Sequence, residues 1–362
     1  MSGPKTHSWI DDLDIYAAGK SKAGSVKKPI KLSANESALG PSPLAMEAYV
    51  KAAADLHRYP DPAYVDLRSV LAEKHKIEAD QIVCGVGSDE ILKLACRAYL
   101  SPGDEAIYVA HSFSMYPIAI RSVGGHPIEV EDVDFTANID NMLNAITDKT
   151  RIIFIANPNN PTGTYLKSEE IERLWQKIPD HILLILDAAY AEFVDDVNYD
   201  AGIDLVNRSK NVLMTRTFSK LYGLAALRLG WGYACKEIAQ TLDKIRDPFN
   251  VPSSAQIAGI AAAKDIDFER KVIEHTKKWR CWLSAELSAI GLNPVLSATN
   301  FILFEFPDKN KSATSANDFL TNHGYILRYY SGQGLENFLR LTIGTENENK
   351  EVIRLLKEFL EK

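Results

Sequence analysis

The chain has 362 residues, of which 46% are hydrophobic and 25% charged, and this composition is typical of a folded protein large enough for two domains. The formal net charge of −7 argues against a nucleic-acid partner, and no long Lys/Arg block is present. No apolar run approaches the length that spans a bilayer, so we expect no membrane partner and a cytoplasmic protein.

The first part of the chain predicts an arm followed by two helices. Residues 1–30 are mixed in charge and contain Gly and Pro, which favours an extended arm. Ser42 followed by Pro43 is typical of a helix start, and a second helix is expected over 63–75. The first of these helices has an apolar face that includes Met46, Tyr49, Val50 and Ala53.

A glycine-rich turn follows the first predicted strand, residues 81–84. The turn reads Gly85-Val86-Gly87-Ser88-Asp89-Glu90 and opens a helix. A strand, a glycine turn and a helix start form a general anion site, because free backbone N–H groups and the helix dipole point at the ligand. Glu90 stands where a dinucleotide fingerprint has its third glycine, so a single phosphate fits better than a dinucleotide.

Strand-like and helix-like runs then alternate, which indicates a mostly parallel sheet with helices on both faces. The expected strands are 106–109, 127–130, 152–156, 182–186 and 211–215, and the expected helices are 116–123, 139–146, 168–177, 237–246 and 255–287. The last part predicts strands at 301–306, 326–328 and 338–343 and a final helix from about 350. We therefore expect an α/β fold with an arm over 1–30, a large domain over 31–245 and a smaller α+β domain over 246–362.

Three polar clusters follow predicted strands at the end where α/β sheets carry their chemistry. They contain Asn160, Asp187 with Tyr190, and Ser219 with Lys220. Taken singly, each has a structural explanation as a turn, a helix cap or a solvated lysine. Lys220 precedes an almost uncharged segment, and a lysine held among apolar groups loses basicity and becomes nucleophilic. With the anion turn, the clusters supply an amine, a carboxylate, hydrogen-bond donors and a phosphate cradle, which an aromatic aldehyde cofactor with one phosphate requires.

These motifs resemble the aspartate-aminotransferase-like family of pyridoxal-phosphate enzymes, in which N-P-x-N-P-T-G, D-x-x-Y and S-K-x-x-x-x-x-x-x-R occur in this order. The resemblance covers nearly the whole chain and implies the fold-type I architecture. Within the family, the chain is most similar to the members that act on histidinol phosphate. The segments that carry this similarity are Leu32–Glu36, Arg58–Pro62, Gly87–Glu90, Asn157–Gly163, Arg216–Lys220 and Leu339–Thr345.

The resemblance implies pyridoxal 5'-phosphate as the cofactor and assigns a role to each motif residue. Lys220 forms the Schiff base, Asp187 pairs with the ring nitrogen, and Asn160 and Tyr190 contact the ring oxygen; Lys220, Asp187 and Tyr190 are the expected catalytic residues. Phe113 stacks on the ring. The residues expected to hold the phosphate are Gly87, Ser88, Asp89, Thr217, Ser219 and Arg228, with Tyr59 contributed by the neighbouring subunit of a homodimer.

Two arginines point to the substrate. Arg340 lies in an apolar strand and needs an anion, for which a structural ion pair is the alternative explanation. By resemblance, Arg340 and Arg328 bind the anionic groups of substrates, with Asn160 beside them and Tyr16 of the arm covering the site. We therefore expect L-histidinol phosphate and 2-oxoglutarate to be converted to imidazole-acetol phosphate and L-glutamate.

Two other readings of the sequence make different predictions. Aromatic amino-acid aminotransferases use a similar arginine for an α-carboxylate, so phenylalanine and tyrosine are the alternative substrates. A nucleotide-binding oxidoreductase could use the Gly85–Gly87 turn, but it would not need the lysine cluster.

The four cysteines lack C-x-x-C spacing and lie in apolar runs, so we expect buried thiols and no metal site: Cys84, Cys96, Cys235 and Cys281.

Overall fold

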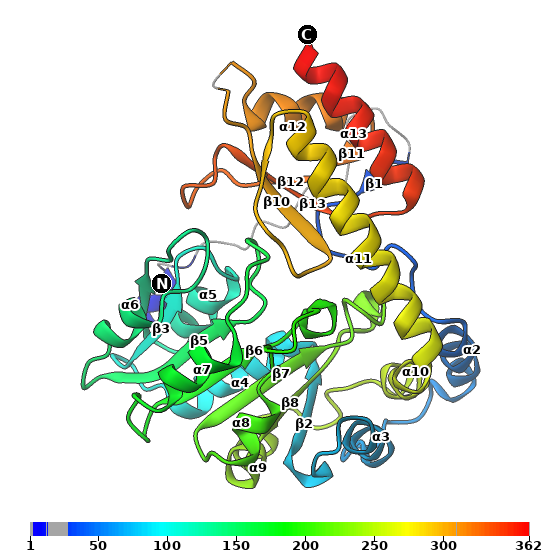
Figure 1. Ribbon diagram of the computed structural model, residues 1–362. Coiled ribbons are helices and arrows are strands. Elements are labelled where there is room, and N and C mark those ends of the chain that lie inside the picture. The colour runs from blue at the N-terminus through cyan, green and yellow to red at the C-terminus, as the bar shows by residue number, and fades with distance from the viewer. Residues whose placement is uncertain (1–2, 12, 14–27, 309, 362) are drawn as a thin grey trace.

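The computed structural model describes residues 3–11, 13, 28–308 and 310–361. Tyr16 and most of the predicted arm lie outside these residues. The described chain forms a large unit around a central sheet and a smaller unit beside it (Figure 1). None of the helices in these ranges is long and apolar enough to cross a membrane.

The large unit is built on a seven-stranded sheet with the order β2-β8-β7-β6-β5-β3-β4. Five strands pair in parallel, whereas β8 runs antiparallel to both of its neighbours, β2 and β7. The sheet is therefore mostly parallel, and the predicted fold class is confirmed. Its strands are β2 (Ile82–Val86), β3 (Glu105–Val109), β4 (His126–Val130), β5 (Thr150–Ala156), β6 (Leu183–Asp187), β7 (Val212–Thr217) and β8 (Leu229–Ala234).

Helices cover both faces of this sheet, and for this reason the central strands are buried on both sides. One face packs against α4 (Ser88–Tyr99), α5 (Met115–Ser122) and α9 (Lys236–Ile245). The helices on the other face are α3 (Val65–His75), α6 (Ile139–Asn144), α7 (Ser168–Trp175), α8 (Ile203–Asn207) and α10 (Ser253–Lys264). The two outlying helices are α1 (Ser8–Asp11) and α2 (Pro43–Ala52).

The small unit is a four-stranded antiparallel sheet covered by helices. Its order is β12 (Arg328–Tyr329), β13 (Phe338–Thr342), β10 (Phe301–Glu305) and β9 (Asn293–Pro294). Beside it, β1 (Ile30–Lys31) pairs in parallel with β11 (Tyr325–Ile326). Its core includes the helices α11 (Ile266–Ala289), α12 (Ala313–Asn322) and α13 (Glu346–Glu361).

Several expected elements differ from the structure. β8 was not expected as a strand. The single helix expected over 255–287 is divided into α10 and α11, because the Asp265 side chain accepts a hydrogen bond from Phe268 N and so caps the start of α11. α10 packs against α2 and α3 of the large unit, so the division at residue 246 stays a prediction. Ser42 caps α2 as expected, but the predicted apolar face of this helix is exposed, with Val50 65% accessible.

Candidate active site

A pocket of about 400 Å³ lies at the carboxyl ends of the central strands and reaches residues of the small unit. Its volume suits a small organic ligand. Among the residues expected from the sequence, those that line it are Ser88, Asp89, Phe113, Asn160, Asp187, Tyr190, Thr217, Ser219, Lys220, Arg228, Arg328 and Arg340.

Among the expected site residues that the structure describes, two do not line this pocket. Gly87 lies directly behind it, next to the guanidinium of Arg228. Tyr59 is 82% exposed and stacks on Phe249 on the outer surface, with the ring centroids 4.7 Å apart. Tyr16 lies outside the described residues. Within the described ranges, no group of three His, Cys, Asp or Glu is placed to hold a metal ion.

Lys220 follows β7 and its amine faces the pocket. The amine donates to Ala34 O at 3.1 Å and lies 5.7 Å from the centroid of the Tyr190 ring. Burial, and next the positive charge of Arg340, lower the pKa of Lys220 to about 8. An appreciable fraction of this amine is therefore neutral near physiological pH, as a nucleophile requires.

Asp187 ends β6 and is held by two hydroxyl groups. Tyr116 donates its hydroxyl to Oδ2 at 2.9 Å, and Thr215 donates to Oδ1 at 3.2 Å. Burial raises the pKa of Asp187 to about 6, and the two hydrogen bonds act against this rise. The carboxylate is thus largely ionised at neutral pH, yet it is 5% exposed and can pair with a cationic ligand group at the pocket floor.

The amide and the phenol expected at the ring oxygen are fixed by other pocket residues. Tyr190 accepts at its hydroxyl oxygen from Asn35 Nδ2 at 2.9 Å. Asn160 accepts at Oδ1 from Arg340 Nη1, so its amide nitrogen is left to donate into the pocket. Both groups therefore have a defined orientation before any ligand arrives.

The anion turn between β2 and α4 has the shape that the sequence predicts. Gly87 has φ +77°, and a Cβ built there would lie 2.6 Å from Arg228 Nη2, so glycine is needed for both reasons. Arg228 also donates to Ser219 Oγ at 3.3 Å and to Asp89 Oδ2 at 3.2 Å. The first N–H groups of α4 and this guanidinium converge on one place, which is a site for an anion.

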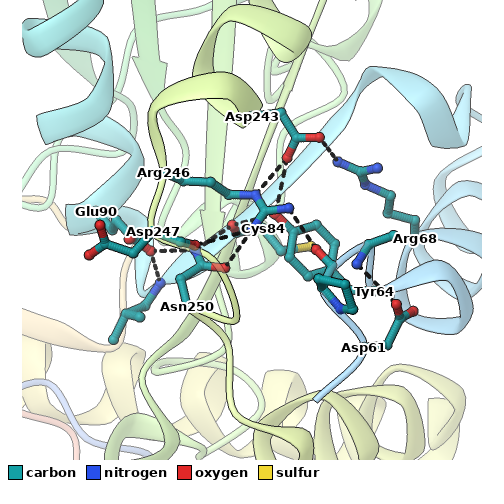
Figure 2. Close-up of polar contacts among 12 residues, drawn as sticks. Asp61, Tyr64, Arg68, Cys84, Glu90, Asp243, Arg246, Asp247 and Asn250 are labelled. Atoms are coloured by element: carbon teal, nitrogen blue, oxygen red, sulfur yellow. Dashed lines mark hydrogen bonds and ion pairs between the residues drawn. The ribbon is translucent and has the colours of Figure 1, made fainter. Parts of the chain in front are cut away.

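Behind the turn, a polar cluster joins it to α9 and to the segment that follows Tyr59 (Figure 2). Glu90 Oε2 accepts from Val86 N at 2.6 Å and from Asn250 Nδ2 at 2.8 Å. Asn250 Oδ1 in turn accepts from Arg246 at 3.4 Å, and the same guanidinium donates to Pro62 O at 2.6 Å. The turn is therefore braced from outside the pocket.

At the opposite side of the pocket, two arginines face each other on neighbouring strands. Arg328 of β12 and Arg340 of β13 are directly paired across the antiparallel ladder, and both line the pocket. Arg340 is 6% exposed and donates Nη2 to Ser33 O at 2.8 Å. Like charges directly opposite on adjacent strands repel, so this arrangement calls for an anionic ligand.

Sequence reasoning missed four residues that shape the site. Asn35 was noted only as part of a motif, and neither Tyr116 nor Thr215 was assigned a role towards Asp187. A Cβ at Gly230 of β8 would lie 2.2 Å from Ser88 N, so this glycine lets the anion turn approach the strand. For Tyr116, a tyrosine on the apolar face of a helix three residues after Phe113 was the available signal, because a buried hydroxyl needs a partner.

Comparisons with known proteins identify the family of the chain. The profile of the family described as aminotransferase class I and II matches residues 27–356. Over 361 residues and 99% of each chain, the sequence is 47% identical to the histidinol-phosphate aminotransferase of Paramagnetospirillum magneticum. The structure is similar to that of the histidinol-phosphate aminotransferase of Sinorhizobium meliloti in complex with pyridoxal-5'-phosphate, with TM-score 0.93, 27% identity and coverage of 99% and 98% of the two chains.

A more distant structure shares the fold alone. A double mutant of the aspartate aminotransferase of Thermus thermophilus is 22% identical, with TM-score 0.83 over 99% of this chain and 100% of that one. The family profile spans nearly all of the sequence, and the full-length relative is well above 30% identical. The chain therefore belongs to the aminotransferase class I and II family.

Proposed function

We propose that this chain is a pyridoxal-phosphate-dependent aminotransferase that converts L-histidinol phosphate and 2-oxoglutarate to imidazole-acetol phosphate and L-glutamate, a step of histidine biosynthesis. The pair of opposed arginines, Arg328 and Arg340, is the observation that supports this choice of substrate. A phosphate group carries close to two negative charges at neutral pH, and the two guanidinium groups match it. The names of the full-length relatives support the same activity.

The residues of the pocket fit the cofactor. A side chain at Gly87 would fill the anion cradle, and Arg340 Nε is buried without a hydrogen-bond partner among the described residues. Pyridoxal phosphate, when bound, supplies an aldehyde for an amine and a ring that accepts electrons released from the substrate. In this proposal the phosphate group is held by Ser88, Asp89, Thr217, Ser219 and Arg228.

The other pocket residues then act on the ring and on the proton that moves. Asp187, as a carboxylate, keeps a proton on the ring nitrogen. Asn160 and Tyr190 would donate to the ring oxygen, and Phe113 would cover one face of the ring. The amine of Lys220 would hold the cofactor and would carry the proton taken from the substrate Cα. A pKa of about 8 suits Lys220 to both accept and return a proton near neutral pH.

We further propose that the active protein is a homodimer in the reducing cytoplasm. Exposed apolar side chains gather on α2 and on the segment after it, which is typical of a surface that a second copy covers. They are Leu44, Met46, Tyr49, Val50, Leu56 and Tyr59. In this proposal Tyr59, whose ring stacks on Phe249, reaches the phosphate site of the other subunit. All four cysteines are free, which is consistent with this compartment. Cys84 and Cys96 are buried as expected, whereas Cys235 is only partly buried and Cys281 is exposed.

Arg328→Ala tests the substrate assignment. We expect kcat/KM for histidinol phosphate to fall about ten- to a thousandfold, roughly 1.4–4 kcal/mol, because one of two charged donors to the phosphate is lost. The value for phenylalanine should change less. Steady-state transamination of both substrates is measured, with Arg354→Ala on the exposed face of α13 as the control. A wild-type preference for phenylalanine, or an equal loss on both substrates, would favour an aromatic aminotransferase.

A further inference from the structure

His111 joins the large unit to the small unit beside the pocket, between the pocket residues Ser112 and Gln333. It follows β3, and its Nδ1 lies 2.7 Å from Asp132 Oδ2, which follows β4. Its Nε2 lies 2.7 Å from the backbone carbonyl of Gln333, in the loop between β12 and β13. Both contacts have good hydrogen-bond lengths.

The two partners of this imidazole can only accept hydrogen bonds. A carboxylate and a backbone carbonyl have no proton to donate, so each ring nitrogen must carry one. A neutral ring has a single N–H, and its other nitrogen would then present a lone pair to an oxygen. The geometry is therefore satisfied only by the doubly protonated ring.

The charged surroundings of His111 favour this form. The hydrogen bond that Asp132 accepts is the main cause that raises the pKa of His111, and partial burial opposes it; the Asp132 side chain is 7% exposed. The Gln333 carbonyl and the charge of Glu131 raise the pKa further. The ring of Phe135 packs on the imidazole at 5.6 Å between centroids and brings no charge.

The loop that His111 holds carries one side of the substrate site. Tyr330 and Gln333 both line the pocket. The guanidinium of Arg328 lies 5.4 Å from the centroid of the Tyr330 ring, and that of Arg340 lies 5.9 Å from it. Tyr330, at the start of the 330–334 loop, therefore packs against both arginines of the anion pair. Gln333 has φ +66°, an unfavourable backbone conformation for a residue with a side chain, which the bond to His111 helps to maintain.

We propose that His111 is a positioning residue that fastens the 330–334 loop over the anionic end of the substrate, and that it does so only while its imidazole carries both protons. This proposal rests on the proposed function, because it takes the opposed arginines to bind the substrate phosphate. His111 touches neither substrate nor cofactor in this role. It acts through Gln333 and Tyr330 on the two guanidinium groups.

The proton dependence has a definite sign. The native pKa of His111 is above its ordinary value of about 6.5, so the fastened state is complete at and below neutral pH. As the pH rises through the native pKa, the ring loses one proton and the contact with Gln333 or with Asp132 is lost. The KM for histidinol phosphate should then rise, while kcat changes less.

The first experiment compares the wild-type holoenzyme with His111→Phe, which keeps the ring packing on Phe135 and removes both donors. Between about pH 6.5 and about pH 9.5 we expect the wild-type KM to rise about tenfold. In the variant, KM should be high and nearly constant, so that the two enzymes converge at high pH. His181→Gln is the matched control and should follow the wild type. His181 is an exposed histidine that precedes β6, at the amino ends of the parallel strands and away from the pocket.

Asp132→Asn gives a different expected result and does not leave a buried carboxylate unpaired. An asparagine amide can donate to Nδ1, so a neutral ring can keep its single proton on Nε2 for Gln333. KM should therefore stay low across the whole pH range in this variant. A purely structural role for His111 would make Asp132→Asn resemble His111→Phe, and that result would overturn the proposal.

Hydrogen–deuterium exchange of residues 330–338 tests the fastening without turnover. After correction for intrinsic rates, protection of this segment in the wild type should fall as the pH rises, and it should be low at every pH in His111→Phe. Equal protection in both proteins at all pH values would refute the contact. If the wild type does not act on histidinol phosphate but the exchange behaves as expected, the proposed function fails and the fastening stands.

Discussion

At the scale of one residue, the buried carboxylate of Asp187 suits the proposed reaction but lowers the stability of the fold at neutral pH. The hydroxyl groups of Tyr116 and Thr215 and the backbone N–H of Ala189 donate to it, and its native pKa of about 6 lies above the ordinary value of 3.8. A carboxyl group with a raised pKa binds its proton more tightly in the folded state, so folding becomes less favourable as the pH rises through the range between the two values. The ionised form at neutral pH is therefore a cost to the protein without its cofactor.

Asp187→Asn should separate these two effects. We expect the apoprotein of this variant to unfold at the same or a higher temperature than the wild type at neutral pH, because a buried charge is removed. The transamination rate should fall by about a hundredfold or more, since a neutral amide does not keep the ring nitrogen protonated. Thermal unfolding and kcat are measured beside Asp204→Asn on the exposed side of α8. A variant with the parent rate would remove Asp187 from the mechanism.

At the scale of elements, the ends of the parallel strands could be predicted and their pairing partners could not. An apolar run that ends in Asn157, Asp187 or Ser219 marks the site edge of the sheet, because buried strands read as continuous apolar segments. β8 was missed because Leu229–Ala234 contains two glycines and no alternation of apolar and polar residues. The strand expected over 326–328 is interrupted at Leu327, and the opposition of Arg328 to Arg340 depends on a register that only the folded sheet defines.

The brace behind the anion turn is another element that local patterns do not reveal, because Glu90 and Asn250 lie far apart in the sequence. Asn250→Ala removes the donor that holds Glu90 against Val86 N. We expect the affinity for pyridoxal phosphate to fall about tenfold, roughly the value of one hydrogen bond to a charged group. The affinity for pyridoxal, which lacks the phosphate, should stay unchanged. Equilibrium titration measures the affinity for both compounds. An equal loss of affinity for both would mean that Asn250 supports the stability of the fold and not the phosphate site.

At the scale of the whole molecule, the described chain leaves an apolar surface without cover on α2. Val50→Glu places a charge in the middle of this surface, and we expect the proposed dimer to dissociate to monomers because a buried unpaired charge is costly at an interface. Val197→Glu, at a valine that is 99% exposed elsewhere on the large unit, should remain dimeric. Sedimentation velocity distinguishes the outcomes. A Val50→Glu protein that is still dimeric would place the interface on another face.

The antiparallel strand β8 also constrains the order in which the protein can fold during its synthesis. β2 has β8 as its partner in the sheet, and β8 is the last of the seven strands to leave the ribosome. In a nascent chain that ends before Leu229, the anion turn has already been synthesised. The strand that precedes it, β2, still lacks its partner β8. The phosphate cradle and the reactive lysine become parts of one site in the same late event, when β8 inserts between β2 and β7.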